Sequence, residues 1–111
     1  MSELYIDDAV KYDVFKAMET YRWYFAQHGD PFEGERRARE FLKQCLSFID
    51  RVEREPYSFP PFHLYPFDGF DSDYRSYKID WFIALYTIDN EIPYIWRLVN
   101  ARSDFGRIHR R

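Results

Sequence analysis

Four arginines in the last third of the chain could bind an anionic group together. Arg75 and Arg97 lie in stretches that resemble strands, and Arg102 and Arg107 follow the second of these stretches. A guanidinium group can bind a phosphate or carboxylate through two parallel hydrogen bonds. Phe105 lies between the last two arginines and could stack on a base. The sequence therefore predicts a target-binding surface formed by Arg75, Arg97, Arg102, Phe105 and Arg107.

Arg97 also has a purely structural interpretation. It interrupts the otherwise apolar stretch IPYIWRLV, where a guanidinium group could lie at a sheet edge or pair with a carboxylate of the same chain. The terminal Arg110 and Arg111 are expected to be solvated. Both interpretations of Arg97 remain open from the sequence.

Other common reactive sites are not predicted. The three histidines and the single cysteine are scattered, without the paired spacing of metal ligands. The acidic run at 68–73 lacks the residue order of a calcium-binding loop and its closing glutamate. Cys45 lies among apolar residues at helical spacing, which predicts a core position rather than a nucleophile. We expect neither a metal nor another cofactor.

The charge distribution sets one end of the chain apart. Residues 92–111 contain five arginines and one aspartate, a net charge of +4, while the rest of the chain carries −7, which gives the overall −3. Screening limits the reach of exposed charges to about 10 Å, so a basic segment can attract an anionic partner despite acidic surroundings. Charge therefore favours an anionic partner for this segment.

Two amphipathic helices are expected to support these residues. The first has apolar residues at helical spacing over 10–25 and should end near Gly29, which readily adopts a left-handed conformation. The second begins at DPFE, where Asp30 can be the N-cap and Pro31 suits the first helical position. The joint is so short that the two helices must form an antiparallel hairpin.

Three strands should follow a connecting loop, rich in proline and aromatic residues, at about 56–73. The stretches YRSYKI, WFIALYTI and IPYIWRLV are β-branched and aromatic and are separated by turn residues, which predicts an antiparallel meander. In the central stretch both alternating sets are apolar, with Trp81, Ile83 and Leu85 on one side. The helical hairpin can cover one face, which leaves the other for the loop or for a partner.

The whole chain, 1–111, is predicted to form a single α+β domain. Its length is typical of one domain, and its 46% of hydrophobic residues in periodic patterns argues against disorder. No apolar stretch reaches the roughly 18 to 20 residues of a membrane helix. The first residues lack the features of a signal peptide, and one cysteine cannot form an internal disulfide, so we expect a cytoplasmic protein.

The order of these elements resembles the RelE/ParE superfamily, the toxins of type II toxin–antitoxin pairs. The resemblance depends on a short strand near ELYID, a helical hairpin, and a meander that ends in VNARSDF, and it covers about residues 3–107. It implies an N-terminal strand and an antiparallel helical hairpin packed on a C-terminal antiparallel β-meander. It also implies a cognate antitoxin as partner and either DNA gyrase or the ribosome with its mRNA as target.

The resemblance assigns roles to individual arginines. Arg102 falls where the family has the arginine after its last strand, and the following Asp104-Phe105 resembles the family's Asp-Tyr or Asp-Phe. Arg75 and Arg97 match basic positions of the flanking strands. These correspondences support the same target-binding surface that the residue types predict.

Two departures from the family pattern affect the expected activity. Ile83 falls where the family commonly has an arginine, and Phe105 lacks the hydroxyl that could move a proton in RNA-cleaving members. His109 is the remaining titrating group nearby and a weak catalytic candidate. Ribosome-dependent RNA cleavage stays possible, but a gyrase-directed mode is slightly favoured. The alternative is a non-toxic protein-interaction module or regulator that retains the fold.

Overall fold

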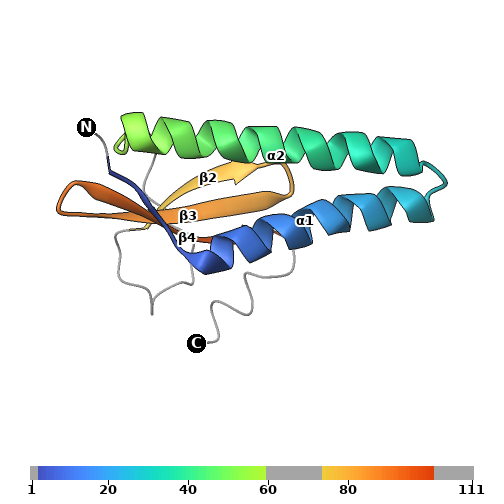
Figure 1. Ribbon diagram of the computed structural model, residues 1–111, viewed down its shortest axis with the longest axis horizontal. Coiled ribbons are helices and arrows are strands. Elements are labelled where there is room, and N and C mark those ends of the chain that lie inside the picture. The colour runs from blue at the N-terminus through green and yellow to red at the C-terminus, as the bar shows by residue number, and fades with distance from the viewer. Residues whose placement is uncertain (1–2, 60–73, 102–111) are drawn as a thin grey trace.

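The computed structural model describes residues 3–59 and 74–101. It has two helices and a four-stranded sheet, and Figure 1 shows the helices side by side along one face of the sheet. In chain order the elements are β1 (Tyr5–Ile6), α1 (Asp8–Gln27), α2 (Pro31–Arg54), β2 (Arg75–Ile79), β3 (Phe82–Asp89) and β4 (Ile92–Asn100). The predicted α+β class is confirmed.

Both helices begin at aspartates that act as N-caps. The Asp7 side chain accepts a hydrogen bond of 2.8 Å from a backbone N–H in the first turn of α1. The Asp30 side chain accepts one of 3.0 Å from the Glu33 N–H, and Pro31 occupies the first position of α2. Gly29, between the helices, has a φ of 79°, the conformation that commonly ends a helix. The predicted hairpin and its joint are confirmed.

The strands lie in the order β1-β4-β3-β2. β2, β3 and β4 are antiparallel neighbours, as the predicted meander requires. Their turns contain Asp80, Asn90 and Glu91, which all have positive φ values. β1 is only two residues long and pairs in parallel with β4, so the sheet is mixed. The register of β3 and β4 shifts at Leu85 and Tyr86, where the ladder contains a bulge.

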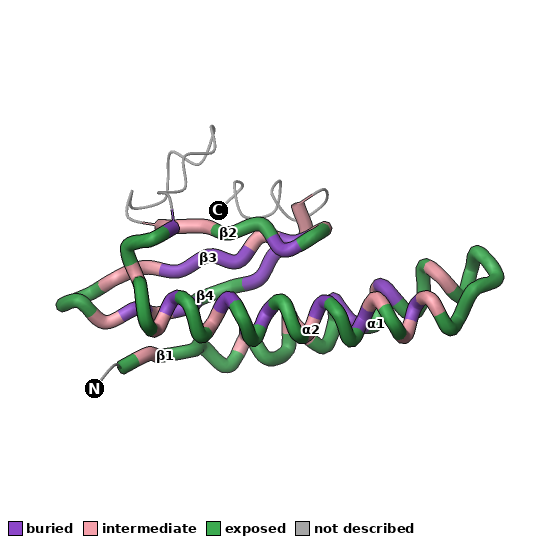
Figure 2. Tube along the Cα trace, turned by 90° about the horizontal axis from the view of Figure 1, so that it is seen from above, coloured by how far each residue is buried: buried purple, intermediate pink, exposed green. Residues whose placement is uncertain are grey.

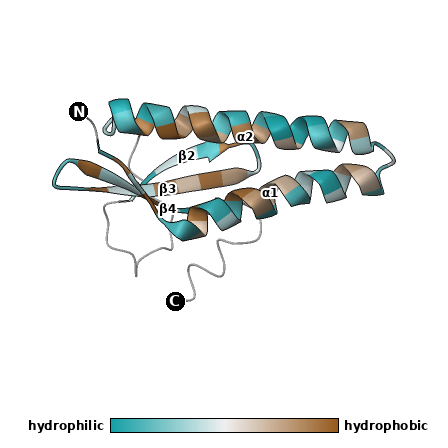
Figure 3. Ribbon diagram, viewed as in Figure 1, coloured by the Kyte–Doolittle hydropathy of each residue, from teal (hydrophilic) through white to brown (hydrophobic). Residues whose placement is uncertain are grey.

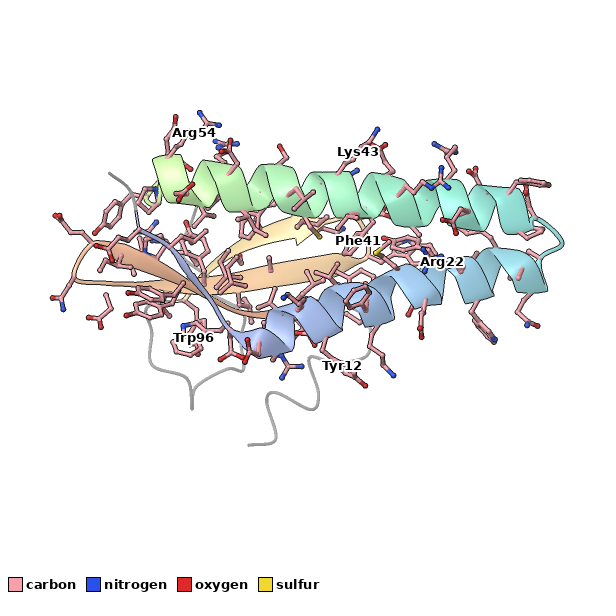
Figure 4. The ribbon with its side chains drawn as sticks, in the orientation of Figure 1. Tyr12, Arg22, Phe41, Lys43, Arg54 and Trp96 are labelled. Atoms are coloured by element: carbon pink, nitrogen blue, oxygen red, sulfur yellow. The ribbon has the colours of Figure 1, made fainter. Side chains whose placement is uncertain are left out.

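The core lies between the helices and the sheet, where the buried residues of both layers face one another (Figure 2). β3 supplies much of it and is hydrophobic over part of its length in Figure 3. Large aromatic side chains from both helices and from β3 fill much of the space, and Figure 4 shows Phe41 directed from α2 toward the sheet. Among the residues that the structure describes, the largest fully buried side chains are Tyr21, Tyr86, Phe41, Ile79, Ile95, Val52 and Pro93.

Trp81 does not lie where strand alternation predicts. The pattern placed it beside Ile83 and Leu85 on one face of the central strand, but β3 begins one residue later. Trp81 therefore belongs to the turn, where Asp80 has a φ of 54°. Its ring stacks on Tyr21 of α1, with the ring centroids 4.7 Å apart. The prediction was wrong because a period of two applies only within the strand itself.

Cys45 is buried on the core side of α2, as its helical spacing predicts. Burial in apolar surroundings raises the pKa of its thiol from 9.0 to about 12. At neutral pH the group is a protonated, inaccessible thiol, and it is not an activated nucleophile.

The Cys45 thiol makes the stability of the protein depend on alkaline pH. Above pH 9 the unfolded chain has lost this proton and the folded chain keeps it, so folding is progressively disfavoured. We expect the free energy of unfolding to fall between pH 9 and 10 by up to about 1.4 kcal/mol. Urea unfolding at several pH values measures this slope, and Cys45→Ala should flatten it. Equal slopes for the two proteins would contradict the prediction.

Candidate functional site

Arg97 forms a bidentate ion pair with α1. Its Nε lies 2.9 Å from Asp13 Oδ2, and its Nη2 lies 3.1 Å from Asp13 Oδ1. Asp13 Oδ2 also accepts a hydrogen bond of 3.0 Å from the Leu98 backbone N–H. This N–H lies on the edge of β4 beyond the two residues that pair with β1. Asp13 therefore connects α1 to both a side chain and the backbone of β4.

The two members of this ion pair differ in exposure. The Arg97 side chain is 51% exposed, whereas that of Asp13 is 9% exposed. The structural interpretation of Arg97, a guanidinium paired with a carboxylate of its own chain, is thus confirmed for this contact. Because half of the arginine side chain still meets solvent, the contact is also compatible with a role in binding.

Loss of the Asp13 carboxylate should destabilise the protein more than loss of an ordinary surface carboxylate. We expect Asp13→Ala to lower the free energy of unfolding by about 2 kcal/mol, because the Leu98 N–H and Arg97 both lose their acceptor. Asp13→Asn should cost about half as much, since its amide oxygen can still accept from the Leu98 N–H. Urea unfolding would measure both values.

Asp50 offers a matched control for Asp13. It pairs with Arg54 one turn along α2, and both side chains are 61% exposed. Asp50→Ala should change the free energy of unfolding by less than about 0.5 kcal/mol. If Asp13→Ala cost no more than Asp50→Ala, Asp13 would not connect α1 to β4 in the way described.

Arg75 contacts the segment that leaves α2. Its Nη1 donates a hydrogen bond of 2.6 Å to the Phe59 carbonyl, and its guanidinium lies 5.2 Å from the centroid of the Tyr57 ring. The Tyr86 hydroxyl of β3 donates to the Pro56 carbonyl of the same segment. Burial raises the pKa of Tyr86, which keeps this donor protonated. Arg75 therefore has a structural role that the sequence did not indicate.

The predicted target-binding residues are described only in part. Arg75 and Arg97 lie on β2 and β4, with β3 between them, and each contacts a different part of the chain. Of the predicted loop at about 56–73, the structure describes residues up to 59. The convergence of the whole set stays a prediction. Outside the described residues lie Arg102, Phe105, Arg107 and His109.

A second polar cluster joins both helices to the turn between β2 and β3. The Tyr21 hydroxyl donates a hydrogen bond of 2.6 Å to Asp80 Oδ2, and Arg37 Nη2 lies 3.7 Å from the same oxygen. Burial, and then the hydrogen bond to Asp80, raise the pKa of Tyr21. The sequence analysis did not predict this cluster. The feature that could have indicated it is Tyr21, a polar hydroxyl on the otherwise apolar stripe of α1. The protonated hydroxyl anchors the turn and is unsuited to act as a base.

The sheet face turned away from the helices carries a row of stacked aromatic rings. Tyr94 stacks between Tyr5 and Trp96, with centroid distances of 5.0 and 5.7 Å. The Trp96 indole N–H donates a hydrogen bond of 2.6 Å to Thr87 Oγ1, and Figure 4 shows Trp96 on the far side of the sheet from α2. Leu85 belongs to the alternating set of β3 residues on the face opposite the core residues of that strand, and it is only 3% exposed. At Leu85 the predicted covering of both faces of the central strand is confirmed.

Comparison with known proteins does not assign this chain to a family, because neither a protein-family model nor a curated protein sequence matches it. Within residues 3–59 and 74–101, neither helix combines the length and the apolar character needed to cross a membrane. Over the same ranges, no three potential metal ligands of the His, Cys, Asp or Glu type come together. The features of the described residues that could bind a partner are thus the arginine side chains and the exposed aromatic surfaces.

Proposed function

We propose that this protein is the toxin component of a type II toxin–antitoxin system that acts in the cytoplasm on a macromolecular target. The order of its elements carries the proposal: a short strand, an antiparallel helical hairpin and a β-meander, as the resemblance to the RelE/ParE superfamily implies. Its partners would be a cognate antitoxin and DNA gyrase or the ribosome with its mRNA. Gyrase is slightly favoured because Ile83 and Phe105 lack the groups of RNA-cleaving members.

Arg97 supports this proposal by its place near the end of β4. Its guanidinium is held by Asp13 while half of the side chain remains exposed. The chain continues from β4 into residues 102–111, which contain four further arginines. Charge-assisted hydrogen bonds from such a set would bind phosphate or carboxylate groups of the target. Fixing the guanidinium in advance lowers the entropy lost when the target binds.

Growth of bacteria after tightly controlled induction of this chain tests the proposal. Arrest of growth is the expected result, and pulse labelling in the same culture identifies the target. Early loss of DNA labelling would indicate gyrase, and early loss of protein labelling would indicate the ribosome. Undisturbed growth in the presence of soluble, folded protein would overturn the toxin assignment.

A pair of variants separates target binding by Arg97 from its effect on stability. Arg97→Ala with Arg102→Ala should abolish growth arrest, because both predicted contacts to the target are lost. Asp13→Asn keeps both arginines and weakens only the ion pair, so it should remain toxic. Melting temperatures of the purified proteins show whether each variant is folded. If Asp13→Asn were as inactive as the double variant, the role of Arg97 would be structural.

A non-toxic protein-interaction module is the second candidate function. The contacts of Arg75 with Phe59 and of Arg97 with Asp13 favour it, because each arginine already has a role within the fold. Large exposed aromatic side chains on α1, described below, also favour it. The induction experiment separates the two functions, since such a module would leave growth unchanged.

A further inference from the structure

α1 has a second apolar surface on the side away from the core. Tyr12, Phe15 and Trp23 are 62%, 62% and 64% exposed. At 100° per residue they lie on one side of the helix, roughly opposite the residues that enter the core. Figure 4 shows Tyr12 directed away from α2 and the sheet. We call Tyr12, Phe15, Lys16, Glu19 and Trp23 the outer stripe of α1.

The outer stripe is nearly symmetric about its own midpoint. Lys16 Nζ lies 5.6 Å from the centroid of the Tyr12 ring, and Glu19 lies between Lys16 and Trp23 along the helix. The midpoint of α1 between residues 17 and 18 lies halfway between Tyr12 and Trp23. It also lies halfway between Lys16 and Glu19. An aromatic residue thus lies at each end, and two opposite charges lie between them.

We propose that the outer stripe binds a second copy of this chain, with the two α1 helices antiparallel across a two-fold axis. In this arrangement Tyr12 of each copy faces Trp23 of the other. Lys16 then faces Glu19 of the other copy, and the symmetry forms this contact twice. The stripe is complementary to itself, because aromatic residues face aromatic residues and opposite charges face each other. A two-fold interface requires this self-complementarity. The inference does not depend on the proposed toxin function.

Charge also selects the register of the two helices. If the helices shifted so that Phe15 faced Trp23, the two-fold axis would pass at Glu19 and place the two Glu19 carboxylates opposite each other. Like charges in contact disfavour that register. The register with Tyr12 facing Trp23 is the one in which aromatic contacts and charge pairs form together.

The exposed area predicts a weak dimer. A large aromatic side chain can bury about 150–250 Å², so three that are about three-fifths exposed offer roughly 300–450 Å² per copy. This is about half of the roughly 800 Å² that each partner buries in a standard interface. We therefore expect a dissociation constant in the micromolar range and a dimer that dissociates on dilution.

Sedimentation equilibrium of the purified full chain between about 1 and 200 μM tests the proposal. We expect Lys16→Glu and Glu19→Lys each to weaken dimerisation at least tenfold, because each puts like charges face to face. The double variant Lys16→Glu with Glu19→Lys restores the opposite charges with their positions exchanged and should recover dimerisation. Circular dichroism shows whether each variant retains its helices.

Phe32→Ala provides a matched control for Trp23→Ala. Phe32 is 89% exposed on α2, outside the outer stripe, so its removal should leave dimerisation unchanged, whereas Trp23→Ala should weaken it. A wild-type protein that is monomeric at 200 μM would overturn the proposal. So would single charge variants that dimerise like the wild type, or a double variant that does not recover.

Discussion

Tyr21→Ala is expected to lower the free energy of unfolding by about 4 kcal/mol, among the largest effects of any single change in this protein. The ring is completely buried and stacks on Trp81, and it also contacts Phe41 and Phe82, at centroid distances of 5.4 and 6.0 Å. Its removal leaves a cavity where α1, α2 and the start of β3 meet. Chemical unfolding monitored by circular dichroism measures the loss.

Two further variants identify the source of this effect. Tyr21→Phe keeps the packing and loses the hydrogen bond to Asp80, whose carboxylate can still be hydrated, so it should cost about 1 kcal/mol. Tyr12→Ala removes the same side chain from an exposed position of the same helix, and in protein dilute enough to keep the proposed dimer dissociated it should change stability by less than about 0.5 kcal/mol. Equal losses for Tyr21→Ala and Tyr21→Phe would show that the hydrogen bond, not the packing, dominates.

Tyr21→Phe should also change the response to strong alkali. The folded protein holds the pKa of Tyr21 above its ordinary value of 10.0, so the stabilisation is present below pH 10 and is lost as pH rises further. The phenylalanine variant has no hydroxyl to ionise at this position. Its stability should therefore fall less steeply than that of the wild type above pH 10.

Gly34→Val is expected to destabilise the helical hairpin by about 3 kcal/mol. A Cβ atom at Gly34 would lie 3.1 Å from Arg22 Cα and 3.2 Å from both Tyr21 O and Phe25 Cβ, which are tight contacts with α1. The γ-methyl groups of valine would force the helices further apart. Thermal or chemical unfolding of the variant measures the cost.

Smaller substitutions distinguish close packing from backbone conformation. At Gly34, alanine gains about 1 kcal/mol of helix propensity, which offsets the tight contacts, so the net change should stay within about 1 kcal/mol. At Gly29 nothing lies within 4 Å of an added Cβ, but φ is 79°. Gly29→Ala should therefore cost about 1 kcal/mol, and Gly29→Asn should cost less because asparagine tolerates this conformation. A harmless Gly34→Val would contradict the close approach of the helices.

Much of the fold could be predicted because its signals are local. The N-cap at Asp30, the turn at Gly29 and the apolar stripes of both helices depend on residues within a few positions of one another. The three strands of the meander follow from alternation and turn residues in the same way. These features determined the helical hairpin and the antiparallel part of the sheet.

The site was harder to predict because its contacts join distant residues. Asp13 and Arg97 are 84 positions apart, and their pairing depends on where α1 crosses the edge of β4. The sequence did suggest a carboxylate partner for Arg97 but did not identify which one. Arg75 contacts Phe59 because of the path taken by the chain after α2, which no local pattern specifies. The parallel pairing of the short β1 with β4 likewise joins residues that are far apart in the sequence, so no local pattern specifies it.

The Asp13 carboxylate also occupies a backbone donor at the edge of the sheet, where strands of different molecules could otherwise pair. Where β1 ends, the edge of β4 would otherwise offer the Leu98 N–H to a strand of another molecule, which is how sheets join into fibrils. An incoming strand would have to displace a nearly buried carboxylate and break its ion pair with Arg97. At the opposite edge, β2 presents the exposed Lys78, a charge that disfavours the addition of strands. We therefore expect the contact that positions a candidate binding residue to disfavour aggregation through this edge of the sheet as well.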